Sequence, residues 1–353
     1  MKNRLFHSAI ITAILFLFCI PCESDTPIRT EEAEKDYINR KEAFAQLPGW
    51  KFRCKVMAEA KTIEDYGGRI EFMKKMDKLL ADASKFFQVP GINDAGNNQI
   101  HFFMTEMHEF TGQSKPFMLM DNGATDTTCD LRIIVNGNKT EGDMSGGWMG
   151  NPYLNLGHDF EGLFLGYAIN ALVHEFGHVR GVPDLYSAEL TGENNPINGE
   201  GFEATRCIMN YPYGENVWSD YAKMIINVSA DTRLCTMHYT FLAKNGSQAK
   251  VLKANGETAL GAYLKFYPVY AYSGKVADQP LYEGEISEEN GYVFPQDPFI
   301  VPNQDNKDNN ITNYLVEITY NGKTTYRWMP MYEAQYAAYN GQDPYIFTIR
   351  LEE

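Results

Sequence analysis

The chain has 353 residues, of which 44% are hydrophobic and 22% are charged, the composition of a globular protein with one large domain or two medium ones. Its formal net charge is −15. Nucleic acid and anionic membranes are therefore not expected as partners, because an acidic surface repels both of them.

The N-terminus has the pattern of a secretory signal peptide over residues 1–22. Lys2 and Arg4 precede an apolar run over residues 9–20, and polar chain follows. The run is too short for a comfortable bilayer span, so we expect a secreted, periplasmic or cell-surface protein with no membrane span after processing. A proline precedes Cys22, where a lipoprotein signal requires a small residue, which disfavours a lipid anchor at that cysteine.

The next part of the chain predicts a leader followed by strands and a long helix. Residues 23–48 are polar and charged, typical of a linker or short surface helix, and nothing in them identifies a propeptide. Alternating apolar residues predict a strand over 50–57, and a 3.6-residue apolar period predicts a helix over 63–87. Further strands are predicted at 100–110 and 131–135.

A metal-binding pattern, H-E-x-x-H-x-x-G-x-x-D, begins at His174. On a helix, His174 and His178 lie on one face, so that both imidazoles can hold one Zn²⁺. Glu175 is too short to be an equal third ligand but can reach a water on the metal and take its proton. Gly181 can end the helix and let Asp184 return as the third ligand.

The metal-binding helix is expected to follow an N-cap at Asp159 and to bury one apolar face opposite the histidines. The residues of this face are Leu165, Ile169, Leu172, Val173 and Phe176. The polar loop over residues 187–206 offers rival third ligands, which rank below Asp184 because their segment lacks helical periodicity. These rivals are Glu189, Glu193, Glu200 and Glu203.

A methionine follows in the segment Cys207-Ile-Met209-Asn-Tyr211. Together with the histidine pattern, this segment resembles the metzincin zinc peptidases, whose motif ends in a third histidine and is followed by a methionine-containing turn. Asp184 replaces that histidine, and the chain is similar in this to snapalysin-type and immune-inhibitor-A-type peptidases. The resemblance covers residues 160–211. It implies that Met209 forms a hydrophobic floor beneath the metal and that Tyr211 approaches the metal and the transition-state oxyanion.

The resemblance also implies an α+β fold for residues 49–232. It would contain a twisted sheet, a backing helix, the active-site helix and the methionine turn. The edge strand of such a sheet pairs with the backbone of the substrate, and the glycine-rich stretch over 142–155 is the candidate for that edge. A short helix is predicted over 217–228 after the turn.

Residues 236–353 change in character, with short alternating runs separated by turns. They predict an all-β antiparallel sandwich, immunoglobulin-like or transthyretin-like. Its clearest element is a hairpin over 314–328 around Asn321-Gly322, and strands are also predicted at 262–272, 345–351 and, as a strand-turn-strand unit, 283–294. A stabilising module and a substrate-binding or surface-binding module are both open roles for it.

The remaining candidate sites carry weaker signals. Four cysteines remain after removal of the signal peptide, namely Cys54, Cys129, Cys207 and Cys235. They can pair in three ways, and the pairing that contains a Cys207–Cys235 disulfide is favoured. The other histidines, His101, His108, His158 and His238, are interpreted as structural or solvated. Ca²⁺ is chemically suited to the oxygen-rich segments 121–126 and 303–310, but neither has EF-hand spacing.

These patterns predict a secreted zinc-dependent endopeptidase that acts on peptides or proteins, with Glu175 as the general base. Two alternatives stay open, the first with the C-terminal β-sandwich as its active part and the second with the same residues as the peptidase. One is a catalytically inert zinc protein that acts as an adhesin or surface binder, and the other is a zinc hydrolase of a non-peptide amide or ester. The sequence does not indicate cleavage specificity, oligomeric state or whether the protein is anchored or released.

Overall fold

The computed structural model describes residues 31–111, 128–135, 146–147, 153–156, 166–210, 216–228, 243–270, 274–302 and 309–352. It is a mixed structure of helices and several sheets, in agreement with the predicted α+β class. The predicted signal peptide lies outside the described residues. Among the helices that are described, none is both long and apolar enough to cross a bilayer.

The first sheet has the strand order β2-β1-β3-β5-β4. Its neighbours are parallel except at one end, where β4 runs antiparallel to β5. The strands are β1 (Trp50–Glu59), β2 (Ile100–Phe110), β3 (Leu131–Val135), β4 (Gly146–Gly147) and β5 (Tyr153–Leu156). The three strands predicted in this half are confirmed, and the glycine-rich stretch supplies the edge strand β4.

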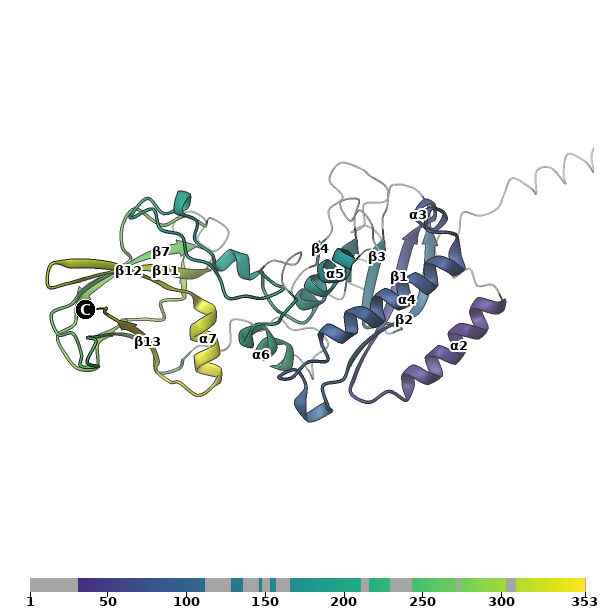
Figure 1. Ribbon diagram of the computed structural model, residues 1–353, viewed down its shortest axis with the longest axis horizontal. Coiled ribbons are helices and arrows are strands. Elements are labelled where there is room, and N and C mark those ends of the chain that lie inside the picture. Colours follow the sequence, from purple (N-terminus) through teal and green to yellow (C-terminus); the bar gives the residue numbers. More distant parts are fainter. Residues whose placement is uncertain are drawn as a thin grey trace, which may run out of the picture.

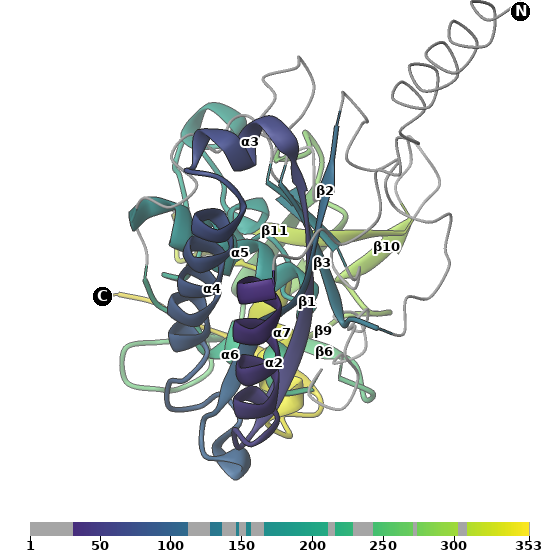
Figure 2. The same cartoon turned by 90° about the vertical axis from the view of Figure 1, so that its right-hand side faces the viewer.

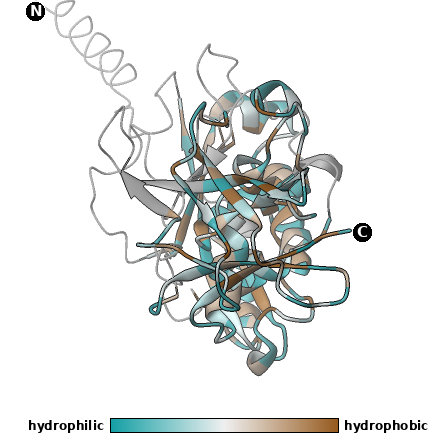
Figure 3. Ribbon diagram, turned by 90° about the vertical axis from the view of Figure 1, so that its left-hand side faces the viewer, coloured by the Kyte–Doolittle hydropathy of each residue, from teal (hydrophilic) through white to brown (hydrophobic). Residues whose placement is uncertain are grey.

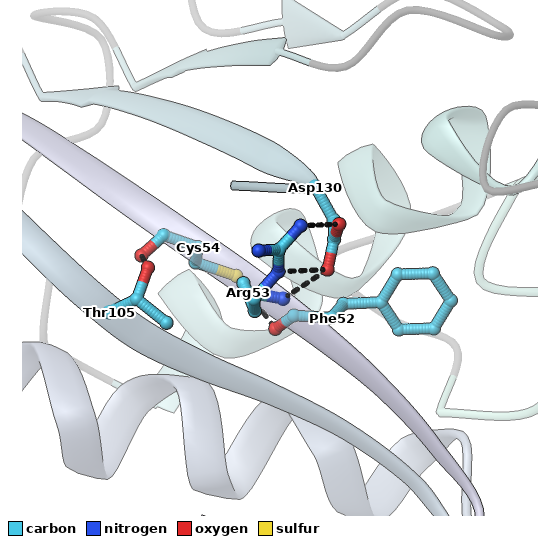
Figure 4. A network of polar contacts seen from close by, with 5 residues as sticks. All are labelled: Phe52, Arg53, Cys54, Thr105 and Asp130. Atoms are coloured by element: carbon cyan, nitrogen blue, oxygen red, sulfur yellow. Dashed lines mark hydrogen bonds and ion pairs between the residues drawn. The ribbon is translucent and has the colours of Figure 1, made fainter. Parts of the chain in front are cut away.

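An ion pair fixes the register between β1 and β3 (Figure 4). The Arg53 guanidinium donates to Asp130 Oδ1 at 2.9 Å, and the Arg53 backbone N–H donates to Asp130 Oδ2 at 2.8 Å. The Asp130 N–H donates in return to the Arg53 carbonyl at 2.8 Å. On the other side of β1, the Thr105 hydroxyl of β2 donates to the Cys54 carbonyl at 3.2 Å. Side chains thus connect β1 to both of its neighbours, β2 and β3.

The helix predicted over 63–87 is broken in two, which corrects the prediction. The chain forms α3 (Ala60–Asp65) and α4 (Arg69–Phe86), separated by Gly67 and Gly68 at φ values of +97° and +84°. Glycine alone takes such values without strain, so this pair ends one helix and starts the next. The polar leader contains α2 (Glu31–Ala45), which lies against the edge strand β2 through the stacked rings of Phe44 and Phe103.

The core of this half lies between the sheet and two helices, α4 and α5 (Gly166–Val179), as Figure 2 shows. The Phe102 ring of β2 stacks on Phe176 of α5, with ring centroids 4.0 Å apart, and lies 5.2 Å from the Phe87 ring. Leu172 and Val173 are also fully buried, as predicted for the apolar face of α5. This packing fixes the helix that carries the histidines.

The C-terminal half contains two further sheets (Figure 1). One has the order β10-β11-β7-β8 with β12 also paired to β11, and the other has the order β13-β6-β9. The strands are β6 (Ser247–Leu252), β7 (Tyr263–Tyr270), β8 (Tyr282–Glu285), β9 (Tyr292–Val293), β10 (Ile300–Pro302), β11 (Asn309–Tyr320), β12 (Lys323–Met329) and β13 (Tyr345–Arg350). Asn321 and Gly322 have φ values of +50° and +76°, which confirms the primed turn predicted between β11 and β12.

Three features of this half differ from the predicted all-β antiparallel arrangement. A helix, α7 (Met331–Tyr339), follows β12, and β13 pairs with β6 in parallel. The helix begins after Pro330, which has no N–H for a sheet, and it buries Met331 and Ala334. The predicted strand-turn-strand unit is divided, because β8 pairs with β7 whereas β9 pairs with β6 of the other sheet.

One hydrophobic core is shared by the two C-terminal sheets. Val251 and Ile349 of the smaller sheet and Phe266 and Val316 of the larger sheet are buried within the same cluster. Figure 3 shows hydrophobic segments near the centre of this half and hydrophilic ones at its margin. Each sheet therefore depends on the other for burial of its apolar face.

The helix predicted over 217–228 is one turn shorter than expected, because α6 spans Asp220–Val228. Among the described cysteines, Cys54, Cys129 and Cys207 are buried and none is joined by a disulfide. Cys235 lies outside the described residues, so its pairing with Cys207 stays a prediction.

Candidate metal centre

A glycine ends the metal-binding helix in the predicted manner. Gly181 has a φ of +84°, and its N–H donates to the His178 carbonyl at 2.8 Å. The Val182 N–H donates to the Gly177 carbonyl at 3.0 Å. This pair of hydrogen bonds is a Schellman motif, which reverses the chain just after the second histidine. The predicted N-cap, Asp159, lies outside the described residues.

The reversal brings the three predicted ligands together. His174 Nε2 and His178 Nε2 lie 3.1 Å apart, and Asp184 Oδ1 lies 3.1 Å and 3.2 Å from them. Ligand atoms around one tetrahedral Zn²⁺ are about 3.3 Å apart when each is about 2.0–2.1 Å from the ion. The three atoms therefore have the spacing of ligands on a single small cation, and the group could hold a metal ion.

Main-chain carbonyls fix the tautomer of both histidines. His174 Nδ1 lies 3.0 Å from the Ile208 carbonyl oxygen, and His178 Nδ1 lies 2.9 Å from that of Val182. A carbonyl only accepts, so each Nδ1 carries the hydrogen and donates it. Each neutral ring then presents a lone pair at Nε2, which faces the other ring and the Asp184 carboxylate. Three electron-pair donors in contact need a cation between them, and outer hydrogen bonds of this kind orient metal ligands.

The electrostatics of the metal-free group show the same need for a positive charge. Burial alone would raise the pKa of Asp184, but its contacts with His174 and His178 outweigh burial and hold that pKa well below its usual range. Burial alone would lower the pKa of His178, but Asp184, followed by Glu175, outweighs it and raises that pKa. In the absence of a metal, these contacts therefore favour the protonated form of His178.

Met209 lies directly under the metal-binding helix. Its side chain is fully buried, and a Cβ added at Gly177 would lie only 2.3 Å from the Met209 sulfur. The Met209 carbonyl also accepts a hydrogen bond at 2.9 Å from the N–H of Leu185, the residue after the aspartate ligand. The turn over residues 207–210, here called the Met209 turn, therefore contacts both the helix and the third-ligand segment.

Two further side chains lie beside the three ligand atoms. Glu175 is partly exposed, and its charge acts on both His178 and Tyr186. Tyr186 is 50% exposed. Burial of the phenol and then the neighbouring Asp184 charge raise the pKa of Tyr186 well above its usual range, so that the phenol keeps its proton. No role for Tyr186 was predicted from the sequence, and the predicted oxyanion donor, Tyr211, lies outside the described residues.

The rival ligands do not join this group. Among the described residues, the two histidines and Asp184 form the one cluster of metal-ligating side chains, and none of the four loop glutamates belongs to it. His108 contacts Glu106 at 3.1 Å, and His101 lies 3.5 Å from Gln88, in line with structural roles. His158, His238 and segment 121–126 lie outside the described residues, as does most of segment 303–310.

Several parts of the site could not be found from the motif. The carbonyls of Ile208 and Val182 are main-chain groups, which every residue type has, so the sequence cannot indicate them. Gly177 does leave a signal, because a glycine between two ligands of a helix weakens the helix and needs a packing reason. No protein-family model matches this chain, and no curated protein matches it.

Proposed function

We propose that this protein is a secreted zinc-dependent endopeptidase. The observation that carries the proposal is the convergence of His174, His178 and Asp184, with both imidazoles held in the tautomer that binds a metal through Nε2. Two imidazoles and one carboxylate are a donor set that suits zinc and leaves a position open for water. The same three residues would hold the ion.

Glu175 is proposed as the general base and acid. When bound, the zinc would lower the pKa of its water and polarise the carbonyl of the scissile bond. Glu175 lies next to His174 on the helix and would take a proton from that water as it attacks the carbonyl carbon. The carbon–nitrogen bond then breaks, and Glu175 returns the proton to the departing amine. Tyr186 and Tyr211 are the two candidates for donating a hydrogen bond to the oxyanion.

The fold supports a metzincin-like arrangement for residues 49–232. The supporting features are the antiparallel edge strand β4, the backing helix α4, and the Met209 turn against the metal-binding helix. Since β4 pairs with β5 at one end of the strand order, its outer edge is the proposed place for the backbone of an extended substrate. For residues 236–353 the shared core of two sheets supports a sandwich that also contains α7.

The first test is digestion of a mixed peptide library by residues 23–353, with and without a zinc chelator, read by mass spectrometry. We expect cuts that the chelator abolishes and that added zinc restores. Glu175→Gln should keep about one zinc per chain by elemental analysis but lose at least about 100-fold in turnover, the scale of one general acid–base group. An active Glu175→Gln variant would show that Glu175 is not the base.

The same experiment separates the alternatives. One zinc per chain without any peptide cleavage would favour a zinc protein that binds surfaces, or a latent enzyme. Zinc-dependent hydrolysis confined to esters or non-peptide amides would favour a zinc hydrolase whose substrates are not peptides. A chain that binds no zinc would contradict the endopeptidase and both alternatives, since each of them contains zinc.

A further inference from the structure

The segment that carries the third ligand runs out of the first half of the molecule and onto the C-terminal half (Figure 1). We call residues 184–206 the ligand loop. Asp184 is the residue just before a short 3₁₀ helix, Leu185–Ala188, and the Ser187 hydroxyl donates to the Asp184 main-chain carbonyl at 2.5 Å. In Figure 1 the loop, drawn in teal, reaches the strands β7 and β12. The position of Asp184 therefore depends on what holds both ends of this short helix.

The near end of the short helix is attached to the Met209 turn, as described above, by the Leu185 N–H. Its far end is attached to the C-terminal half. The indole N–H of Trp328, on β12, donates to the Ala188 carbonyl at 2.9 Å. The Trp328 ring also stacks on Phe202 of the loop, with ring centroids 6.0 Å apart and planes inclined by 16°. One side chain thus contacts the loop at two points.

The rest of the loop is packed against the same sheet. Leu190 is 2% exposed and lies in a cluster with Tyr267 and Leu315 of the strands β7 and β11. It is fixed there because Leu190 and Phe202 exchange two backbone hydrogen bonds, of 2.9 Å and 2.7 Å. Further along, the Val276 N–H donates to the Asn194 carbonyl at 2.9 Å. The loop lacks long helices and strands of its own, and the C-terminal sheet supplies apolar contacts for Leu190, Ile197 and Phe202.

We infer that the C-terminal half positions the metal centre, and that Trp328 is the positioning residue. Trp328 holds Ala188, Ala188 ends the short helix that Asp184 begins, and Asp184 is the ligand that completes the group. This inference rests on the proposed metal site. It assigns the C-terminal half a role in metal affinity. A module that served only as a spacer or bound only surfaces would have no such role.

The test compares Trp328→Phe with Tyr314→Phe in the full mature chain. Phenylalanine at 328 keeps an aromatic ring but cannot donate to Ala188. Tyr314, on β11 of the same sheet, is the matched control, because its ring hydroxyl also donates to a backbone carbonyl, that of Pro298, and its ring lies in a different hydrophobic cluster from the one that contains Leu190 of the loop. Zinc affinity is measured by competition with a chelator, and ligand geometry by the visible spectrum of the Co²⁺-substituted chain.

Trp328→Phe should bind zinc about tenfold more weakly, the lower end of the effect of removing an outer-shell partner, and should shift the Co²⁺ spectrum. Tyr314→Phe should bind zinc as the parent does, even if its melting temperature falls by a similar amount. Equal zinc affinity in Trp328→Phe and the parent would overturn the inference. So would equal weakening by both variants, because general destabilisation would then explain the effect.

Hydrogen exchange gives a readout that does not need the metal. In the metal-free chain, the amides of residues 185–190 should exchange about five- to tenfold faster in Trp328→Phe, the effect of one lost hydrogen bond. If the parent binds no zinc, the proposed function fails, while this measurement still decides whether Trp328 holds the segment that follows Asp184. If Trp328→Phe does not fold, Phe202→Leu removes the ring contact and keeps the Trp328 donor. If a folded Phe202→Leu variant then has the same zinc affinity and the same amide exchange rates at residues 185–190 as the parent, the inference is overturned.

Discussion

At the scale of single residues, the candidate metal centre depends on the hydrogen bonds that its two histidines donate as well as on the lone pairs that they present. His174 and His178 each give the Nδ1 hydrogen to a main-chain carbonyl, which leaves both Nε2 lone pairs facing Asp184. The ligands were predictable because their spacing along one helix and one turn is local in sequence. The carbonyls of Ile208 and Val182 were not, because any residue type supplies a carbonyl and only the fold brings it there.

A pH dependence follows from these neighbours. Because Asp184 raises the pKa of His178 above its ordinary 6.5, zinc must displace a proton from the site at and somewhat above that pH. Zinc affinity should fall by about tenfold per pH unit below the raised pKa, the slope for one displaced proton. Asp184 stays ionised throughout, since its pKa is lowered. Chelator competition between pH 5.5 and pH 8 checks this, and a flat profile would contradict it.

The metal-free chain should show the opposite trend in stability. A raised pKa in the folded state means that the proton on His178 stabilises the fold below the unfolded value, near 6.5, and that this contribution is lost as pH rises through the raised value. The melting temperature of the chelated chain should therefore fall across this window, while the stabilisation gained from added zinc should grow. Thermal melts at several pH values, with and without zinc, measure both trends.

Gly177 offers a test of the contact with Met209. A methyl group there would meet the buried Met209 sulfur, so Gly177→Ala should cost about 1–3 kcal/mol, the usual penalty for overpacking. Met209→Ala alone should cost about 2–5 kcal/mol through the cavity that it leaves. The double variant should be more stable than the sum of the two losses predicts, because each change relieves the other. Additive losses in denaturant unfolding would show that the two residues do not interact.

At the scale of elements, sequence periodicity located β1, β2 and β3 of the first sheet and the buried residues Leu172, Val173 and Phe176 of α5. It failed where turns set the end of a helix or where tertiary contacts decide which strands pair. The adjacent glycines Gly67 and Gly68 indicate a helix break, but the apolar period on both sides of them favoured one continuous helix in the prediction. The helix α7 was missed because the segment after Pro330 lies among strands and is rich in tyrosine, which also suits a strand. Neither the parallel β6–β13 pairing nor the sheet change of β9 leaves a local signal.

The glycine that ends α5 allows a prediction with a matched control. Gly181→Ala should cost about 1 kcal/mol, because alanine at a φ of +84° is strained, and it should weaken zinc binding because the carbonyl of Val182 orients His178. Gly256→Ala introduces the same strain at a φ of +85° in an exposed turn with open space around it. It should lose similar stability and keep its zinc affinity. Equal zinc affinities in the two variants would contradict the role given to Val182.

At the scale of the whole molecule, contacts between the described parts of the two halves include two regions. One is the ligand loop on the C-terminal sheet. The other is a contact between α6 and α7, where the Tyr221 hydroxyl donates to the Gln335 side chain at 2.7 Å in a buried setting.

These contacts predict that metal binding stabilises both halves together. Zinc at about 1,000 times its dissociation constant should raise the free energy of unfolding by about 4 kcal/mol, since it binds the folded chain alone. Calorimetry should show one unfolding transition that moves as a whole to higher temperature. Two transitions, of which only one responds to zinc, would show that the halves unfold independently.

The distance along the chain between Ala188 and Trp328 has a consequence for the order of assembly. The two residues are 140 positions apart, so the short helix after Asp184 gains the hydrogen bond from Trp328 only after β12 has been synthesised. Chains are made from the N-terminus, and contacts between distant residues form late. A nascent chain that stops before β12 should therefore bind zinc more weakly than the finished one, which stalled chains would reveal. A peptidase built in this way would gain its activity only when most of its own synthesis is complete.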